Sequence, residues 1–154
     1  SKLPPMGTLR EVFGPAGVCC IAGNLGGTVR LPFGSAKFIQ ALHGGGAAGC
    51  PACGFLFEIG GKTIYHAGDT ALTMDMALLE DARIDAALLP IGDFYTMGPA
   101  DAIRAVKLIK PQLTIPMHYN TFPAIAQDPA AFAAACQAAG YDAKVLQPGE
   151  KITL

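Results

Sequence analysis

The spacing of the apolar residues changes at Asp69, and this change constrains the fold more than any other feature of the sequence. Before Asp69, apolar and polar residues alternate, which is the pattern of antiparallel strands with one covered face. After Asp69, apolar residues recur at helical spacing between short continuous apolar runs. This order predicts an α/β (α+β) fold, in which a mixed β-sheet carries helices on one face.

The part of the chain before Asp69 is expected to contribute strands. Gly60-Gly61 stands between two of them and supplies the positive φ angles of a tight hairpin turn. Val18 to Ala22 is expected to be a further short buried strand. The alternating segments are Thr28 to Phe33, Lys37 to Leu42, Phe55 to Ile59 and Lys62 to His66.

The part after Asp69 is expected to alternate between helices and buried strands. Pro99 and the pair Asp128-Pro129 stand where helices should begin, because proline is tolerated in a first helical turn and Asp caps it. The predicted helices are Leu72 to Ala82, Pro99 to Lys110 and Asp128 to Gly140. The predicted strands are Ala86 to Pro90, Leu113 to Pro116, and the closing segments Lys144 to Leu146 and Ile152 to Leu154.

Composition limits the classes of protein to which the chain can belong. With 154 residues, 51% of them hydrophobic, it can form one domain over residues 1–154 with a substantial core. Its 11 basic and 12 acidic residues leave a net charge of −1, which gives no electrostatic reason to bind nucleic acid or an anionic membrane. The apolar runs are too short to cross a bilayer, and no leader opens the chain. The five cysteines are an odd number and make a poor disulfide framework, which fits a reducing compartment better. We therefore expect a cytoplasmic protein.

Three side chains that can bind metal stand at the ends of predicted strands. They are His43, Asp69 and His118. Loops at strand ends converge over a rigid sheet, and imidazole with carboxylate is a suitable ligand set for zinc or manganese. Taken singly, each residue has another interpretation, since a strand-end His can be a hydrogen-bonded loop residue and Asp69 can be a turn or helix-capping residue.

The stretch from Gly23 to Glu150 resembles the C-terminal portion of metal-dependent hydrolases of the metallo-β-lactamase superfamily, in the branch close to the L-ascorbate-6-phosphate lactonases. The resemblance rests on an ordered series of motifs. The matching pieces are Asn24-Leu25-Gly26-Gly27, Ala41-Leu42-His43, Gly61-Lys62-Thr63-Ile64-Tyr65-His66-Ala67-Gly68-Asp69-Thr70, Leu88-Leu89-Pro90-Ile91-Gly92, Thr96-Met97-Gly98-Pro99 and Ile115-Pro116-Met117-His118-Tyr119-Asn120-Thr121-Phe122.

The resemblance implies a metal site and a reaction. It makes His43 and His118 metal ligands, and Asp69 the catalytic carboxylate that bridges two zinc or manganese ions. A metal-bound hydroxide would then hydrolyse an ester, lactone or phosphoester of a small molecule. The same resemblance places Thr96, Tyr119 and Asn120 near the substrate.

The sequence departs from the family in one important respect. The HxHxDH signature, which supplies four ligands from the first half of the family's αββα fold, is absent, and the histidines are His43, His66 and His118. We interpret His66 as a strand residue beside the site rather than as a ligand. One copy of this chain therefore represents half of the fold and leaves the site incomplete, so activity and bound metal depend on a second chain.

A lone half would expose the apolar sheet face that meets its twin, and we expect a homodimer in which a second copy or a swapped segment covers that face. The alternative function is a non-catalytic, homodimeric half-fold that acts as a binding or structural remnant. Cys50-Pro51-Ala52-Cys53 has the spacing of a metal or redox motif, but it has no partner pair and precedes a strand. We interpret it as part of a loop near the mouth of the site.

Overall fold

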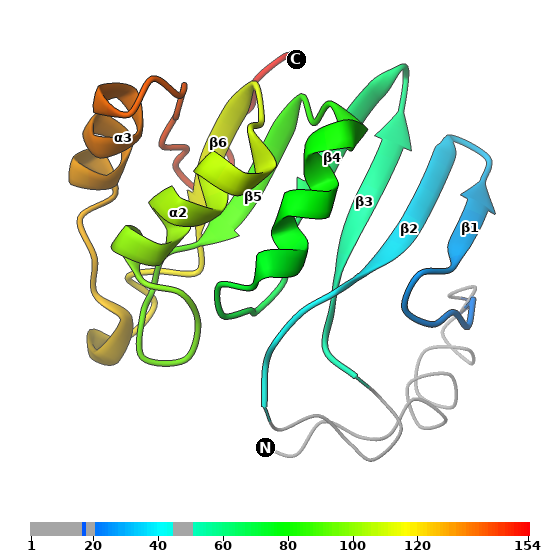
Figure 1. The fold of residues 1–154 in the computed structure, drawn as a ribbon, viewed down its shortest axis with the longest axis horizontal. Helices are drawn as coiled ribbons and strands as arrows, with labels where there is room; N and C mark the ends of the chain where they lie inside the picture. Colours follow the sequence, from blue (N-terminus) through cyan, green and yellow to red (C-terminus); the bar gives the residue numbers. More distant parts are fainter. Residues whose placement is uncertain (1–16, 18–20, 45–50) are drawn as a thin grey trace.

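A single six-stranded sheet forms the centre of the computed structural model, which describes residue 17 and residues 21–44 and 51–154. The strands lie side by side in the order in which they occur in the sequence (Figure 1). They are β1 (Thr28–Leu31), β2 (Gly34–Gln40), β3 (Cys53–Ile59), β4 (Lys62–His66), β5 (Ala86–Pro90) and β6 (Leu113–Met117).

The sheet has an antiparallel half and a parallel half. Strands β1 to β4 pair antiparallel, and the β3–β4 turn is formed by Gly60 and Gly61, whose φ angles are 58° and 78°. Strands β4, β5 and β6 pair parallel, with His66 beside Leu88 and Pro90 beside Met117. Because these three strands run in the same direction, their carboxyl ends meet at one edge of the sheet.

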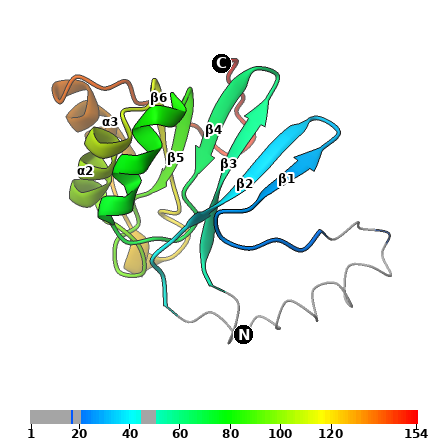
Figure 2. The same cartoon turned by 45° about the vertical axis from the view of Figure 1, so that its right-hand side comes forward.

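Helices cover one face of the sheet, chiefly over its parallel half (Figure 2). They are the 3₁₀ helix η1 (Met74–Ala82), α2 (Pro99–Ile109), the short 3₁₀ helix η2 (Pro123–Ile125) and α3 (Pro129–Ala138). The Asp128 carboxylate caps α3 by accepting hydrogen bonds from the amides of Ala130 and Ala131 at 2.9 and 3.0 Å. Pro99 opens α2 as expected, and Lys110 ends it in the left-handed conformation.

The core lies between this helical layer and the parallel strands. Alternate residues of β5, among them Ala87 and Leu89, point toward the helices and are fully buried. Val106 and Ile109 of α2 meet them from the helical side. Removing each large side chain of this kind from water stabilises the fold by about 1.5–3 kcal/mol.

The other face of the sheet is apolar, and none of the helices in the described residues covers it. Phe55 and Phe57 alternate with residues that face the helices, and their rings stack with centroids 5.6 Å apart. The Phe38 ring lies 5.2 Å from that of Phe55. Ile64 and Leu88 continue the same face across β4 and β5 and are partly exposed.

The mixed sheet with helices on one face is confirmed, and so is the Gly60-Gly61 hairpin. Two details differ from expectation, and a third is not tested. The helix predicted at Leu72 to Ala82 is 3₁₀ rather than α, consistent with Met76, Leu79 and Ala82 recurring every three residues. The two closing strands are wrong, because only Ala143 pairs with Thr114 and the chain then turns away at Pro148. Most of the strand predicted at Val18 to Ala22 lies outside the described residues.

None of the helices in the described residues is long and apolar enough to cross a membrane.

Candidate metal centre

The loops that follow β4, β5 and β6 lie at the lower edge of the sheet in Figure 1. They comprise residues 67–73, 91–98 and 118–128. This edge is where ligands collect in folds with parallel strands, because loops converge there over a fixed sheet. Asp69 is on the first loop and His118 begins the third.

The structure brings two of the three predicted ligands together. His118 Nε2 lies 3.5 Å from Asp69 Oδ1, and their side chains are 31% and 46% exposed. An imidazole nitrogen facing a carboxylate at the protein surface is a donor set that fits a divalent metal such as zinc. In the absence of metal the same two groups can form an ion pair when His118 is protonated.

His43, the third predicted ligand, is linked to Asp69 through the backbone and Thr70. The Leu42 amide donates a hydrogen bond to Thr70 Oγ1 at 3.0 Å, and the Ala71 amide donates to the Leu42 carbonyl at 2.8 Å. The residue before His43 is therefore fastened to the two residues after Asp69. Within the described part of the chain, however, no three His, Cys, Asp or Glu residues are grouped closely enough to hold a metal ion.

The backbone at His118 is held in an uncommon conformation. Its φ angle is 54°, and that of Asn120 is 59°, both in the left-handed region that side chains other than glycine rarely adopt. Gly92 makes room for this turn, since a Cβ atom at Gly92 would lie 2.3 Å from the His118 carbonyl oxygen and 3.4 Å from His118 Nδ1. His118 Nδ1 is buried and has no hydrogen-bond partner among the described residues. Such conformations persist only where the surrounding structure imposes them, and they concentrate at functional sites.

The three residues predicted near the substrate occupy different surroundings. Tyr119 and Asn120 line a cavity of about 510 Å³ together with the C-terminal segment around Leu146 and Pro148, whereas His118 does not line it. Partial burial raises the pKa of the Tyr119 hydroxyl above its usual value. The Asn120 side chain accepts a hydrogen bond from the Gln127 amide at 2.8 Å and so holds its own loop. Thr96 is half-buried on the neighbouring loop, where its hydroxyl donates to the Met97 carbonyl at 3.3 Å.

His66 and Cys53 lie close to this edge of the sheet without joining the pair. His66 is the last residue of β4, and its Nδ1 accepts a hydrogen bond from the Gly68 amide at 3.1 Å. Cys53 begins β3, and burial raises the pKa of its thiol, which makes it less reactive. Cys50 lies outside the described residues, so the interpretation of Cys50 to Cys53 as part of a loop near the mouth of the site stays a prediction.

Exposed aromatic side chains border the same edge. Phe94, Tyr95 and Phe122, which we call the aromatic cluster, are 71%, 54% and 43% exposed. Phe94 and Tyr95 meet edge to face with centroids 4.7 Å apart, and Tyr95 lies 6.1 Å from Phe122. The cluster therefore joins the loop after β5 to the loop that begins with His118.

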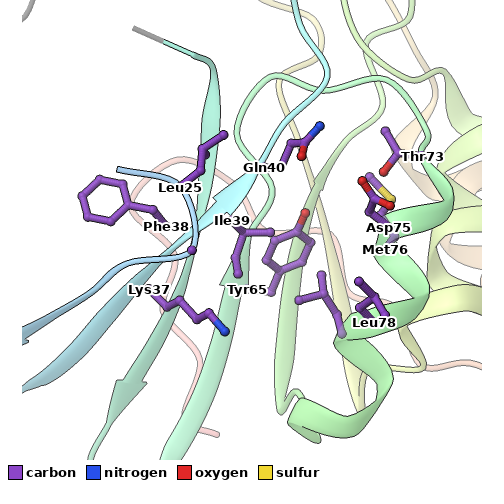
Figure 3. Close-up of a pocket in the computed structure, with 12 residues that line it drawn as sticks. Leu25, Lys37, Phe38, Ile39, Gln40, Tyr65, Thr73, Asp75, Met76 and Leu78 are labelled. Atoms are coloured by element: carbon purple, nitrogen blue, oxygen red, sulfur yellow. The ribbon is translucent and has the colours of Figure 1, made fainter. Parts of the chain in front are cut away.

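A separate hollow of about 390 Å³ lies between the antiparallel strands and η1 (Figure 3). Ile39 and Tyr65 of the sheet line it opposite Met76 and Leu78 of η1. Burial raises the pKa of Tyr65 to about 12, so its hydroxyl remains protonated at neutral pH. None of the predicted site residues lines this hollow. It lies beside η1, where the described helices stop covering the sheet.

Sequence reasoning missed Thr70, Gly92 and the aromatic cluster as parts of the site. Thr70 is only 1% exposed and links the loops of His43 and Asp69. One available signal was its place directly after Asp69. Gly92 follows the apolar run of β5 directly, where a glycine indicates close approach of another backbone. The aromatic cluster has no spacing signal, since Phe122 is distant in sequence from its two partners.

Comparison with known proteins agrees with this architecture. Residues 34–118 match the Beta-lactamase superfamily domain. A UPF0173 metal-dependent hydrolase of Symbiobacterium thermophilum is 53% identical over 135 residues, covering 84% of this chain and 60% of that protein. A UPF0173 metal-dependent hydrolase of Desulforamulus reducens is 50% identical, covering 93% of this chain and 70% of that protein. The structure of Igni18, a metallo hydrolase from Ignicoccus hospitalis, is 36% identical with a TM-score of 0.83, covering 94% of this chain and 64% of that one.

The matched region contains His43, Asp69 and His118 and extends from the start of β2 to the beginning of the third loop. The chain belongs to the metallo-β-lactamase superfamily and, within it, to the UPF0173 family of metal-dependent hydrolases. It spans about 60% of the length of the Symbiobacterium relative.

Proposed function

We propose that this chain supplies His43, Asp69 and His118 to the metal site of a hydrolase that cleaves an ester, lactone or phosphoester of a small molecule. The proposal rests chiefly on one observation, the Asp69 carboxylate facing the His118 imidazole at 3.5 Å at the carboxyl edge of the parallel strands. Membership of a metal-dependent hydrolase family supports it. The resemblance to L-ascorbate-6-phosphate lactonases favours a lactone among these substrates.

The remaining ligands have to come from outside the residues of one copy of this chain. The described residues contain no group of three ligands, and the sequence holds no HxHxDH motif. A second copy, another chain, or a further segment of the same protein could each provide them. Zinc and manganese both suit a mixed imidazole and carboxylate site, and zinc is the one we expect with two histidines.

The residues of this chain prepare the site in distinct ways. A divalent metal held there would lower the pKa of bound water and polarise the scissile carbonyl or phosphoryl group. Asp69 and His118 provide a carboxylate oxygen and Nε2 on one side of the site. Thr70 fixes the loop of His43 against that of Asp69. Tyr119 and Asn120 line the adjacent cavity, where part of a substrate can bind.

Metal binding tests this proposal directly. Isothermal titration of metal-depleted protein with zinc should give a saturable site, and Asp69→Asn should weaken binding by at least about 10-fold, as loss of a metal-site residue does. Asp75→Asn, an exposed Asp of η1, is the matched control and should bind like the parent protein. Equal zinc affinity in the parent and Asp69→Asn proteins would refute the proposed site. Elemental analysis of protein purified without a histidine tag checks that the metal is bound natively.

The apolar sheet face favours a second candidate, the homodimeric half-fold. Phe55, Phe57 and Ile64 lie on the face that the described helices leave uncovered, and such continuous apolar faces are uncommon on monomers. We propose that a second copy of this chain covers this face. Light scattering after size exclusion should give the dimer mass, and Phe57→Lys should shift the mass to that of a monomer. A parent chain that elutes as a monomer and binds no hydrophobic dye would contradict this.

A further inference from the structure

We infer that the proposed hydrolase site takes an uncharged ester or lactone that carries an aromatic or other apolar group, which packs against Phe94, Tyr95 and Phe122. This inference rests on the proposed function and narrows its substrate class. It excludes substrates that carry a phosphate group, which the proposed function includes.

Charge is distributed unevenly over the loops at this edge. The loops after β2, β4, β5 and β6 (residues 41–52, 67–73, 91–98 and 118–128) contain no Lys or Arg. They do contain three carboxylates, those of Asp69, Asp93 and Asp128. Recognition of a phosphate group relies on Arg, Lys or a glycine-rich amide cradle at a helix N-terminus. Asp69 is assigned to the proposed metal, so an anionic group of a substrate bound away from that metal would meet no cation from these loops and would be repelled by the carboxylates of Asp93 and Asp128.

Basic residues that the structure describes lie away from these loops. Lys62 begins β4 and Lys110 follows α2, both at the opposite end of the sheet, where each pairs with a carboxylate. Arg104 pairs with Asp101 on the surface of α2. The chain as a whole has nearly as many basic as acidic residues. The lack of Lys and Arg in the four loops is therefore a local feature of this edge and does not follow from the overall composition.

The aromatic cluster is exposed, and a backbone turn holds part of it in place. Asp93 and Phe94 have φ angles of 60° and 55°, and the Asp93 carboxylate accepts a hydrogen bond from the Phe94 amide at 2.8 Å. This turn keeps the rings of Phe94 and Tyr95 exposed to water. Exposure of apolar rings is unfavourable, since burying them would release water from their surface. Two adjacent residues in the left-handed region are strained, and such strain indicates a functional constraint.

Backbone hydrogen bonds hold the loops of the aromatic cluster against the loops of the proposed ligands. The Met97 amide donates to the Thr70 carbonyl at 2.9 Å, which ties the loop of Phe94 to the residue after Asp69. Phe122 lies four residues after His118, and the Asn120 amide between them donates to Ile125 at 2.9 Å. The cluster is thus fixed relative to Asp69 and His118 from both sides. An apolar substrate group resting on it would be positioned next to the proposed metal.

The reaction for such a substrate balances without any additional reactant. The oxygen of one water molecule bonds to the carbonyl carbon, and the bond from that carbon to the alcohol oxygen breaks. One proton of the water ends on the released alcohol, and the other is lost from the carboxylic acid at neutral pH. A lactone gives a single hydroxy acid by the same steps.

A matched pair of substrates tests the charge argument. The 4-nitrophenyl ester of phenylacetic acid is compared with the same ester bearing a phosphate group on the phenyl ring, using protein saturated with zinc. Both contain the same scissile bond, so differences in intrinsic reactivity are small. We expect kcat/KM for the uncharged ester to be at least about 10-fold higher, the size of one unfavourable charge contact. Equal or higher kcat/KM for the phosphorylated ester would overturn the inference.

A binding experiment tests the aromatic cluster independently of catalysis. The probe is N-(4-fluorobenzyl)acetamide, a stable neutral amide whose binding is followed by ¹⁹F NMR. Phe122→Ala should weaken its binding by about 3- to 10-fold, as loss of one aromatic contact does. Phe33→Ala is the matched control, because Phe33 is similarly exposed, at 59%, but lies in the β1–β2 turn at the other end of the sheet.

The outcomes separate this inference from the proposed function. Failure to bind zinc refutes the proposed function, whereas the amide probe still reports on the aromatic cluster. Unchanged probe binding in Phe122→Ala overturns the inference even if the protein is an active hydrolase. A change of oligomeric mass in Phe122→Ala, with unchanged probe binding, also overturns it, because the cluster would then be a protein interface.

Discussion

The two ends of the parallel strands are built by opposite rules. At the end where β4 begins, charges are paired: Lys62 Nζ lies 3.0 Å from Asp85, and Lys110 Nζ lies 2.7 Å from Glu80. At the carboxyl end, the loops contain left-handed residues, exposed aromatic rings, and a carboxylate that faces a histidine. One end satisfies its polar groups internally, whereas the other leaves chemically useful groups open to a ligand.

The two ends also differ in backbone strain, which lowers stability and concentrates at functional sites. Positive φ angles at the β3–β4 turn fall on Gly60 and Gly61, which adopt them at little cost. At the carboxyl end the same conformation falls on Asp93, Phe94 and His118, each of which has a Cβ that disfavours it. At the end where β4 begins, Arg83 and Lys110, the C-caps of η1 and α2, also have positive φ angles, of 50° and 52°. With Asn120 added, more of the described non-glycine residues adopt this conformation at the carboxyl end, which is therefore the more strained of the two. Three paired substitutions test this comparison, beginning with the largest expected effect.

The first prediction compares one substitution at both ends. Gly92→Ala places a Cβ 2.3 Å from the His118 carbonyl oxygen and 3.1 Å from Ile125 Cβ, inside a buried region. We expect it to lower the free energy of unfolding by about 3 kcal/mol or more, because backbone must move to relieve the overlap. Gly61→Ala has open space around its Cβ and only the left-handed backbone to overcome, with an expected cost of about 1–2 kcal/mol.

Urea denaturation of the two variants measures the difference, and circular dichroism establishes that each is folded at the start. Zinc titration provides the second readout, since Gly92→Ala should displace His118 and weaken metal binding while Gly61→Ala should not. Equal losses of stability with equal zinc binding would show that the carboxyl end is no more tightly constrained than the turn.

The fold was largely predictable from the sequence because its signals are local. The Gly60-Gly61 turn fixes the register of its hairpin, and the continuous apolar run of β5 identifies a largely buried strand inside the sheet. The closing strands could not be predicted correctly, since whether Lys144 to Leu146 pairs depends on contacts with β6 that the local pattern does not contain. The 3₁₀ geometry of η1 likewise depends on packing against α2.

The candidate site was predictable only in part, for the same reason. Each of Asp69 and His118 stands at a strand end, and parallel pairing brings such ends together, so their proximity follows from topology. The bond from the Leu42 amide to Thr70 and the fit of Gly92 against His118 are contacts between distant segments. No periodicity or motif spacing encodes contacts of this kind. They appear only once the strands have a register.

The second prediction uses two buried threonines. Thr70 Oγ1, at the carboxyl end, accepts from the Leu42 amide at 3.0 Å and donates to the Ala71 carbonyl at 2.8 Å. Thr114 Oγ1, within β6, is buried and has no hydrogen-bond partner among the described residues. Thr70→Val should lower the free energy of unfolding by about 1–2 kcal/mol, because the Leu42 amide loses its partner. Thr114→Val should leave it unchanged or raise it by about 1 kcal/mol, since an unsatisfied buried hydroxyl is removed.

Denaturant midpoints of both variants give these values, and zinc affinity distinguishes structure from positioning. Thr70→Val should also weaken zinc binding because the loop of His43 is released from that of Asp69. Thr70→Ser, which keeps the hydroxyl, should restore zinc binding. Destabilisation by Thr114→Val to the same extent as Thr70→Val would contradict the difference between the two sites.

The third and smallest effect concerns the paired charges at the opposite end. The Thr63 amide donates to the Asp85 carboxylate at 2.8 Å and Lys62 lies beside it, and together they hold the pKa of Asp85 below its usual value. A lowered folded-state pKa adds stability above the ordinary Asp pKa of about 3.9, and this contribution disappears as the pH falls through the folded-state pKa. Asp85→Asn should therefore lower Tm at pH 7 and flatten the acid limb of the Tm profile, while Asp81→Asn, exposed on η1, should leave both as they are. If the acid limb is as steep in Asp85→Asn as in the parent chain, the pairing of charges at this end contributes nothing to its stability, and the contrast between the two ends rests on backbone conformation alone.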